Sequence, residues 1–212
     1  MTRTYPINLV LSGRRAVVVG GGPIAERKVK GLLAAGARVT VISPQVTAGI
    51  RRAGARPART RTKDGVRWER RMYQAGDLRG AFVAIAATSD ERVNRAVYRE
   101  AERRGILVNV VDVPPLCNFY APAIVRWGGI TVSVSTGGGA PALAKKIRQD
   151  LQKMGEPYSA MLRWTASVRP RIMRAVPTER ERKRVFTRLV RAKTRAEFDR
   201  LVRQALKNGS AR

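Results

Sequence analysis

The sequence contains no histidine and a single cysteine, Cys117. Without histidine, an imidazole general base is excluded, and so is a metal site with histidine ligands. One cysteine cannot form an intramolecular disulfide, so Cys117 is expected to be a small core residue, and nothing indicates an oxidising compartment. No cluster of the remaining ligand types is recognisable, so the sequence predicts no metal site of the protein's own.

Long apolar segments are also absent. No run approaches the roughly 18 apolar residues that a transmembrane helix needs. Residues 1–11 lack the sustained apolar stretch of a signal peptide, so a cytoplasmic protein is expected. The length of 212 residues allows one dinucleotide-binding domain and a smaller second unit, and 44% apolar residues suffice for a core.

Acidic residues are scarce as well. The chain has 15 Asp and Glu against 43 Lys and Arg, which gives a formal net charge of +28. This surplus predicts strong attraction to polyanions. Nucleic acid, an anionic lipid surface and a small molecule with several carboxylates all remain open as partners.

The first third of the chain has the pattern of a strand, a turn and a helix. Residues 16–20 read AVVVG, which is typical of a buried parallel strand, and glycines follow at once. A helical pattern comes next and ends near Gly36; its apolar face consists of Ala25, Val29, Leu32 and Leu33. Residues 38–42, RVTVI, predict the next strand, which completes the first βαβ unit of a doubly wound sheet.

The alternation of strands and helices continues. Strands are predicted at residues 66–70, 81–87 and 106–111, and a helix at 89–104. Thr88 and Glu91 have the spacing of a capping box at the start of that helix. Residues 45–65 predict a mobile loop or a poor helix. The order indicates an α/β fold, a Rossmann-type doubly wound and mostly parallel sheet.

The pattern changes after Asp112. A strand is predicted at residues 130–134, followed by a turn of small residues and a helix with Leu143, Ile147 and Leu151 on one face. Everything after Tyr158 is helical, with capping-box spacing at Thr178 and Glu181 and at Thr194 and Glu197. We therefore predict three parts: a Rossmann domain at 1–113, a small α+β segment at 114–151 and a helical region at 152–212.

The most informative local signal is GGGPIA, which matches the dinucleotide-binding pattern G-x-G-x-x-A. The first glycine permits a tight turn, and the second lets the backbone approach a pyrophosphate at the N-terminus of the helix. A purely structural glycine turn is the alternative. The predicted cofactor-binding residues here are Gly20, Gly22, Pro23, Ile24 and Ala25.

One expected part of that site is missing. The second strand should end in an acidic residue that binds the adenosine ribose, yet Ser43, Pro44 and Gln45 stand there. Ser43, Pro44 or backbone groups could serve, and nearby arginines leave room for a 2′-phosphate. Thr88 follows the fourth strand, where it could touch nicotinamide or ribose; helix capping is the alternative, and for Asp90 it is the favoured interpretation.

Asp112 ends the apolar strand of the NVVD string. A carboxylate at the ligand edge of a parallel sheet either caps a turn or handles a proton. Residues 135–139, STGGG, precede a helix and predict either an anion-binding nest or a flexible turn. The predicted substrate-binding residues are Asn109, Ser135, Thr136 and Gly137.

Taken together, residues 6–151 resemble the N-terminal dehydrogenase module of sirohaem synthases and the stand-alone precorrin-2 dehydrogenases. The strings that carry the resemblance are GGGPIAERK, GDLRGAFVAIAAT, NVVDVPPLCNFYAPAIV and ITVSVSTGGGAPALAKKIR. The resemblance implies that NAD oxidises precorrin-2 to sirohydrochlorin and that Asp112 is the catalytic residue. It also implies a homodimer joined through residues 114–151. Some members insert ferrous iron, so iron as a second substrate stays open.

Two other functions compete with this one. A nucleic-acid- or polyanion-binding regulatory protein on a Rossmann scaffold is suggested by the basic helices after Lys153. Only 6% of residues are aromatic and no helix-turn-helix is evident, so nucleic acid is expected to bind nonspecifically if at all. A different NAD(P)-linked reductase on the same fold is the other alternative, because fold alone does not fix the substrate.

Overall fold

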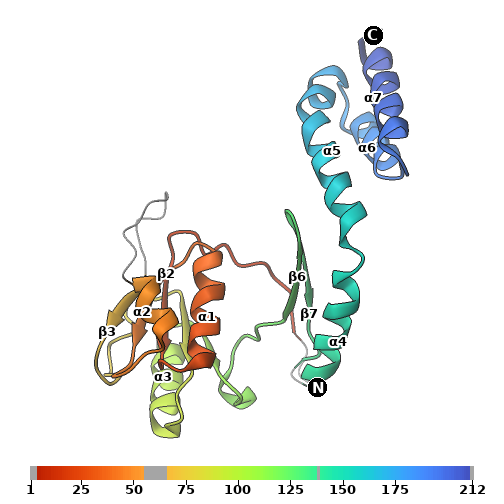
Figure 1. Ribbon diagram of the computed structural model, residues 1–212. Coiled ribbons are helices and arrows are strands. Elements are labelled where there is room, and N and C mark those ends of the chain that lie inside the picture. The colour runs from red at the N-terminus through yellow and green to blue at the C-terminus, as the bar shows by residue number, and fades with distance from the viewer. Residues whose placement is uncertain (1–3, 55–65, 138, 211–212) are drawn as a thin grey trace. The chain divides into compact units, whose positions relative to one another are not determined.

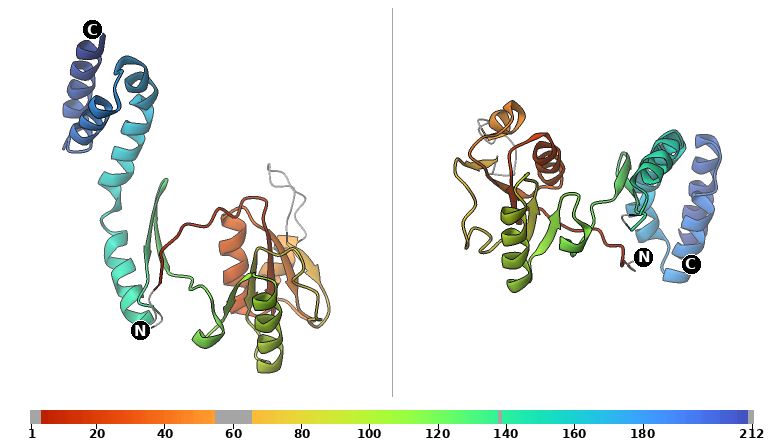
Figure 2. Two further views of the ribbon diagram at one scale, coloured as in Figure 1. Left: turned by 180° about the vertical axis from the view of Figure 1, so that it is seen from behind. Right: turned by 90° about the horizontal axis from the view of Figure 1, so that it is seen from below.

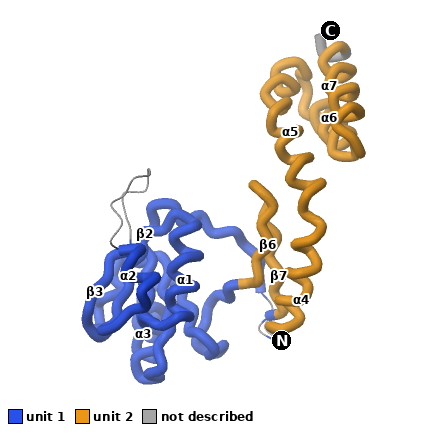
Figure 3. The backbone as a smooth tube through the Cα atoms, in the orientation of Figure 1, with its two compact units in different colours: residues 1–121, 137–139 blue, residues 122–136, 140–212 orange. Residues whose placement is uncertain are grey.

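The computed structural model describes residues 4–54, 66–137 and 139–210. The chain forms two compact units, coloured separately in Figure 3: residues 1–121 with 137–139, and residues 122–136 with 140–212. The glycine turn belongs to the first unit. The predicted middle segment is divided between the units: residues 122–136 and 140–151 share a unit with the C-terminal helices, and the rest belongs to the first unit.

The first unit is built on a parallel sheet of 5 strands in the order β3-β2-β1-β4-β5. Its strands are β1 Arg15–Val19, β2 Arg38–Ile42, β3 Arg67–Glu69, β4 Val83–Ala86 and β5 Leu107–Val110. Val19 lies opposite both Ile42 and Ala86, so three strands end at one level. The predicted α/β fold class is confirmed, and the reversal of strand order falls between β1 and β4.

Helices cover both faces of this sheet (Figures 1 and 2). Helices α1 Pro23–Ala34 and α2 Ala48–Gly54 pack on one face, where Val29 and Ile50 join the core. Helix α3 Glu91–Arg103 packs on the other face through Val97 and Ala101. The segment predicted as a loop or poor helix therefore starts with a short helix, and residues 55–65 lie outside the described residues.

The start of α3 differs from the prediction. Asp90, not Thr88, is the N-cap: one carboxylate oxygen accepts hydrogen bonds from the backbone N–H groups of Arg92 at 2.8 Å and Val93 at 3.3 Å. The predicted capping box of Thr88 and Glu91 is wrong because Asp90 stands immediately before the first helical residue, where a short carboxylate reaches those N–H groups best. The capping interpretation of Asp90 is confirmed.

The second unit begins with an antiparallel hairpin of β6 Ala123–Trp127 and β7 Ile130–Val134. The sequence predicted only β7, because β6 sits directly after a proline-rich segment that reads as irregular. The helices are α4 Pro141–Gln152, α5 Gly155–Ala175, α6 Glu179–Leu189 and α7 Arg195–Ser210. Within the described ranges, no helix is long and apolar enough to cross a bilayer.

The helices α5 to α7 enclose a small core of their own. Ile172, Leu189 and Phe198 are fully buried in it. The hydroxyl of Thr178 accepts a hydrogen bond from the N–H of Glu181, so the predicted cap of α6 is confirmed. Thr194 accepts in the same way from the N–H of Glu197 at 3.2 Å.

One buried carboxylate holds the segment between β3 and β4 to α3. Glu100 on α3 is 2% exposed and accepts hydrogen bonds from Tyr73, from the N–H of Gly76 at 2.8 Å and from Arg104 at 2.8 Å. Burial alone would raise the pKa of Glu100, but these hydrogen bonds outweigh it and the pKa is lowered.

Replacing Glu100 by Ala is therefore expected to lower the free energy of unfolding by about 2–4 kcal/mol, because it leaves several buried donors without an acceptor. Urea denaturation at neutral pH measures this. Glu91→Ala on the exposed start of α3 is the matched control and should change stability much less. Equal effects of the two variants would contradict the assignment.

The lowered pKa also gives this interaction a pH dependence. The stabilisation is fully present above the carboxyl pKa of the unfolded chain, about 4.3, and is lost as the pH falls through the lower pKa of the folded state. The difference in stability between the native chain and Glu100→Ala should accordingly shrink at acid pH.

Candidate functional site

The carboxyl ends of the parallel strands meet at one edge of the sheet, and most predicted site residues follow those ends. Gly20 follows β1, Ser43 follows β2 and Asp112 comes soon after β5. Ligands of doubly wound sheets bind at this edge, where the strand order reverses. The structure therefore brings these residues to the side of the first unit where a dinucleotide is expected.

The turn after β1 leaves no room for side chains at two positions. Gly20 has φ +117°, and a Cβ there would lie 2.3 Å from the carbonyl oxygen of Ala87. A Cβ on Gly21 would lie 1.9 Å from the carbonyl oxygen of Gln45. Glycine at both positions is thus required by the close packing of neighbouring loops.

The third glycine of the turn is different. A Cβ on Gly22 would meet nothing within 4 Å, so the space beside this residue is open. Gly22 is the N-cap of α1, Pro23 and Ile24 are exposed in the first turn, and Ala25 is fully buried against the sheet. Open space over a helix N-terminus with free N–H groups fits a dinucleotide pyrophosphate.

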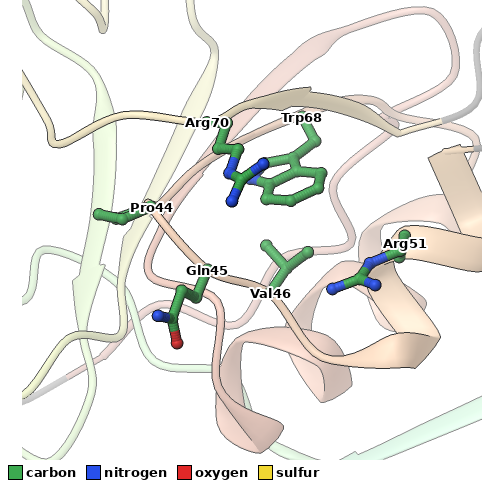
Figure 4. A pocket seen from close by; sticks show the side chains of 6 residues that line it. All are labelled: Pro44, Gln45, Val46, Arg51, Trp68 and Arg70. Atoms are coloured by element: carbon green, nitrogen blue, oxygen red, sulfur yellow. The ribbon is translucent and has the colours of Figure 1, made fainter.

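The end of β2 holds no carboxylate. The hydroxyl of Ser43 donates to the carbonyl of Gln45 at 2.7 Å, so it supports the loop from within. The indole N–H of Trp68 donates to the carbonyl of Ser43 at 2.9 Å. Beside this loop lies a cavity of about 520 Å³, shown in Figure 4. Its lining residues are Pro44, Gln45, Val46, Arg51, Trp68 and Arg70.

Thr88 lies at the end of β4 and is half-buried. Its hydroxyl is 2.8 Å from Oδ1 of Asn94 and 3.0 Å from the carbonyl of Asp90, and its own carbonyl accepts from Asn94 at 3.0 Å. The buried Asn94 thus fixes Thr88 at the carboxyl edge. The contact of Thr88 with a cofactor stays a prediction.

Asp112 has φ +59°, and it is the one non-glycine residue with positive φ in the described part of the chain. Backbone strain of this kind is maintained only when the surroundings enforce it. Asp112 is the third residue of a turn that is closed by a hydrogen bond from the N–H of Val113 to the carbonyl of Val110 at 3.3 Å. The thiol of Cys117 contacts both ends of this turn, the N–H of Val110 at 3.3 Å and the carbonyl of Val113 at 3.4 Å. The exposed carboxylate of Asp112 is therefore presented on a clamped turn.

Cys117 was predicted to be a core residue, and it does pack against the core while only partly buried. Burial raises the pKa of its thiol. Its bridging of the Asp112 turn could not be read from the sequence.

Asn109 lies near the same turn: it is 8% exposed, and its amide donates to the carbonyl of Phe119 at 3.1 Å. Direct contact of Asn109 with substrate stays a prediction.

Lys28 on α1 is a further residue that the sequence did not single out. It is half-buried, and burial lowers the pKa of its ammonium group. The positive charge of Arg27 lowers this pKa further. Cys117 and Asp112 act on the pKa of Lys28 in the opposite direction and raise it. Lys28 therefore lies within electrostatic reach of Asp112.

The predicted substrate loop falls at the boundary between the units. Ser135 and Thr136 belong to the second unit and Gly137 to the first, and Gly138 lies outside the described residues. The hydroxyl of Thr136 accepts from the N–H of Ala140 at 3.1 Å, next to the N-terminus of α4. Among the described residues, no group of three acidic or cysteine side chains could hold a metal ion.

Comparison with known families matches both parts of the chain. The family model described as putative NAD(P)-binding matches residues 7–123, and the model described as sirohaem biosynthesis protein central matches residues 128–154. The chain therefore belongs to the NAD(P)-binding family that forms the N-terminal part of siroheme synthases. NAD(P) binding fits the open space at Gly22.

Individual relatives agree with this family assignment. Siroheme synthase of Methylobacillus flagellatus is 40% identical over 184 residues, 86% of this chain and 38% of that protein. The Pseudomonas aeruginosa PAO1 siroheme synthase is 38% identical over 215 residues, 97% of this chain and 45% of that protein. The chain thus spans less than half the length of these relatives. A solved structure named SirC, precorrin-2 dehydrogenase, matches with a TM-score of 0.79 and 29% identity, covering 96% of this chain and 100% of that one.

The glycine turn yields a paired prediction. Gly22→Ala should leave the melting temperature unchanged, because its Cβ meets only open space, but should weaken NAD(P) binding about tenfold or more by blocking the pyrophosphate. Gly20→Ala should instead destabilise the fold, since its Cβ meets Ala87. Calorimetric titration and thermal unfolding separate the two effects. Unchanged NAD(P) affinity in Gly22→Ala would argue against pyrophosphate binding at this turn.

Proposed function

We propose that this chain oxidises precorrin-2 to sirohydrochlorin, with NAD as the oxidant, in the synthesis of sirohaem. The observation that carries the proposal is the strained, clamped turn of Asp112 at the same sheet edge as the glycine turn. The full-length match to the structure named precorrin-2 dehydrogenase supports the choice of substrate. The relatives named siroheme synthase support the pathway.

The reaction removes two hydrogens from the macrocycle, one as a hydride and one as a proton. NAD, when bound, would supply the hydride acceptor. Gly22 and the N-terminus of α1 would hold its pyrophosphate, and Thr88, fixed by Asn94, would contact its nicotinamide or ribose. The chain must then supply a group that accepts the proton.

Asp112 is that group in our proposal. It is exposed, so a macrocycle can reach its carboxylate, and its turn is held by Cys117. Lys28 places a positive charge within electrostatic reach of it. The amide of Asn109 contacts the same thiol at 3.5 Å. The absence of histidine is then no obstacle to catalysis, because one positioned carboxylate suffices to accept the proton.

Substrate binding rests on charge. Precorrin-2 carries carboxylate side chains around its rim, and a chain of net charge +28 attracts them and raises the rate of encounter. Ser135, Thr136 and Gly137 are proposed to bind one of those carboxylates through hydroxyl and backbone N–H groups. Ferrous iron as a further substrate would use the same carboxylate, Asp112.

Asp112→Asn tests the catalytic assignment. Asparagine tolerates a positive φ, so the turn should survive while the proton acceptor is lost. Anaerobic turnover of precorrin-2 with NAD should fall about a hundredfold or more. Binding of NAD should stay within about twofold, because the pyrophosphate site is untouched.

Asp199→Asn on α7 is the matched control and should turn over at the native rate. Native turnover by Asp112→Asn would leave the reaction in place and remove Asp112 as its proton acceptor. A folded native chain that binds NAD but leaves precorrin-2 unchanged would refute the proposed reaction.

The proposal includes a homodimer joined through residues 114–151. On α4 the apolar side chains Leu143 and Ile147 are 53% and 37% exposed, although their spacing forms a regular helix face. On the neighbouring hairpin Ile124 is 38% exposed. A second copy of the chain would cover this face.

Leu143→Glu is therefore expected to shift the chain from dimer to monomer in sedimentation experiments at micromolar concentration. Lys145→Glu, a charge change at an exposed position of the same helix, is the control. A native chain that sediments as a monomer would contradict the dimer.

A further inference from the structure

The cavity beyond β2 and β3 has an unusual lining for an adenosine site. Its walls come from three places: the loop after β2 with Gln45, helix α2 with Arg51, and the end of β3 with Trp68 and Arg70. Figure 4 shows the side chains of Trp68, Arg70 and Arg51 around the same opening. In a doubly wound fold the adenosine ribose lies at the end of the second strand, next to this cavity.

Both arginines are available for a ligand. Each guanidinium carbon lies 6.0 Å from the centre of the Trp68 ring, and both side chains are exposed. Within the described part of the chain, neither guanidinium forms an ion pair with a carboxylate. The nearest acidic residue in sequence, Glu69, is paired with Arg67 at 2.6 Å.

The Trp68 ring near both arginines is fixed in place. The indole N–H of Trp68 donates to the carbonyl of Ser43, which is the residue directly after β2. This bond ties the cavity wall to the position where an acidic residue would bind both ribose hydroxyls of NAD. Ser43 cannot repel an anion as that acidic residue would, and its hydroxyl is engaged with Gln45.

We infer that this cavity takes the 2′-phosphate of NADP, held by Arg51 and Arg70, so that the chain accepts NADP as well as NAD. Guanidinium groups bind phosphate oxygens through paired, charge-assisted hydrogen bonds. The flat face of Trp68 suits the adenine ring. The inference rests on the proposed dinucleotide site and specifies which form of the dinucleotide fits it.

Calorimetric titration of the full chain with NADP and with NAD, at one fixed salt concentration, tests the inference. NADP should bind at least as tightly as NAD. The double variant Arg51→Gln/Arg70→Gln should bind NADP about tenfold or more weakly, while its affinity for NAD changes by less than about threefold. In the native chain 2′-AMP should compete with NADP, and in the double variant it should not.

Arg99→Gln is the matched control, because Arg99 is exposed on α3, on the other face of the sheet. It removes one charge and should leave NADP affinity unchanged within about twofold. An equal loss of NADP affinity in this control would assign the effect to net charge and overturn the inference.

The remaining outcomes separate the two proposals. If NAD binds and NADP binds more weakly, or if the double variant weakens both to the same degree, the 2′-phosphate site is refuted and the dinucleotide site stands. If the folded chain binds neither dinucleotide, the proposed function falls, and the inference falls with it.

Discussion

The structure of the first unit depends on how closely three loops approach one another at the carboxyl edge of the sheet. The turn after β1 runs against the carbonyl of Ala87 beyond β4 and against the carbonyl of Gln45 beyond β2, with no space for a Cβ at Gly20 or Gly21. This contact is possible only for glycine. It places Gly22, the open N-terminus of α1 and the cavity at Arg51 side by side along one edge, and the chemistry proposed here occurs at that edge.

A second constraint operates at the end of β5. Asp112 adopts a left-handed conformation in a turn that is closed by the hydrogen bond from Val113 to Val110, and the thiol of Cys117 contacts both ends of that turn. Strain of this kind is characteristic of functional turns. The single cysteine of the chain thus contacts both ends of the turn that carries the proposed catalytic carboxylate.

Much of this could be predicted from the sequence, because the parallel strands are short apolar runs and the glycine pattern has a fixed mechanical meaning. The predictions failed where several weak signals competed. Asp90 replaced Thr88 as the cap of α3 because the helix starts later than its apolar pattern indicates. Strand β6 was missed beside prolines. The cavity of Arg51, Trp68 and Arg70, and the approach of Lys28 to Asp112, join residues that are distant in sequence, and only the fold brings them together.

The central claim is that a hydride is transferred from the macrocycle to the dinucleotide bound at the glycine turn. The most direct test is to mix the native chain with precorrin-2 and NAD without oxygen and to follow both products by their absorbance. The account predicts that sirohydrochlorin and NADH appear at the same rate and in equal amounts. Sirohydrochlorin that forms without NADH, or a folded and NAD-binding chain that forms neither product, would contradict it.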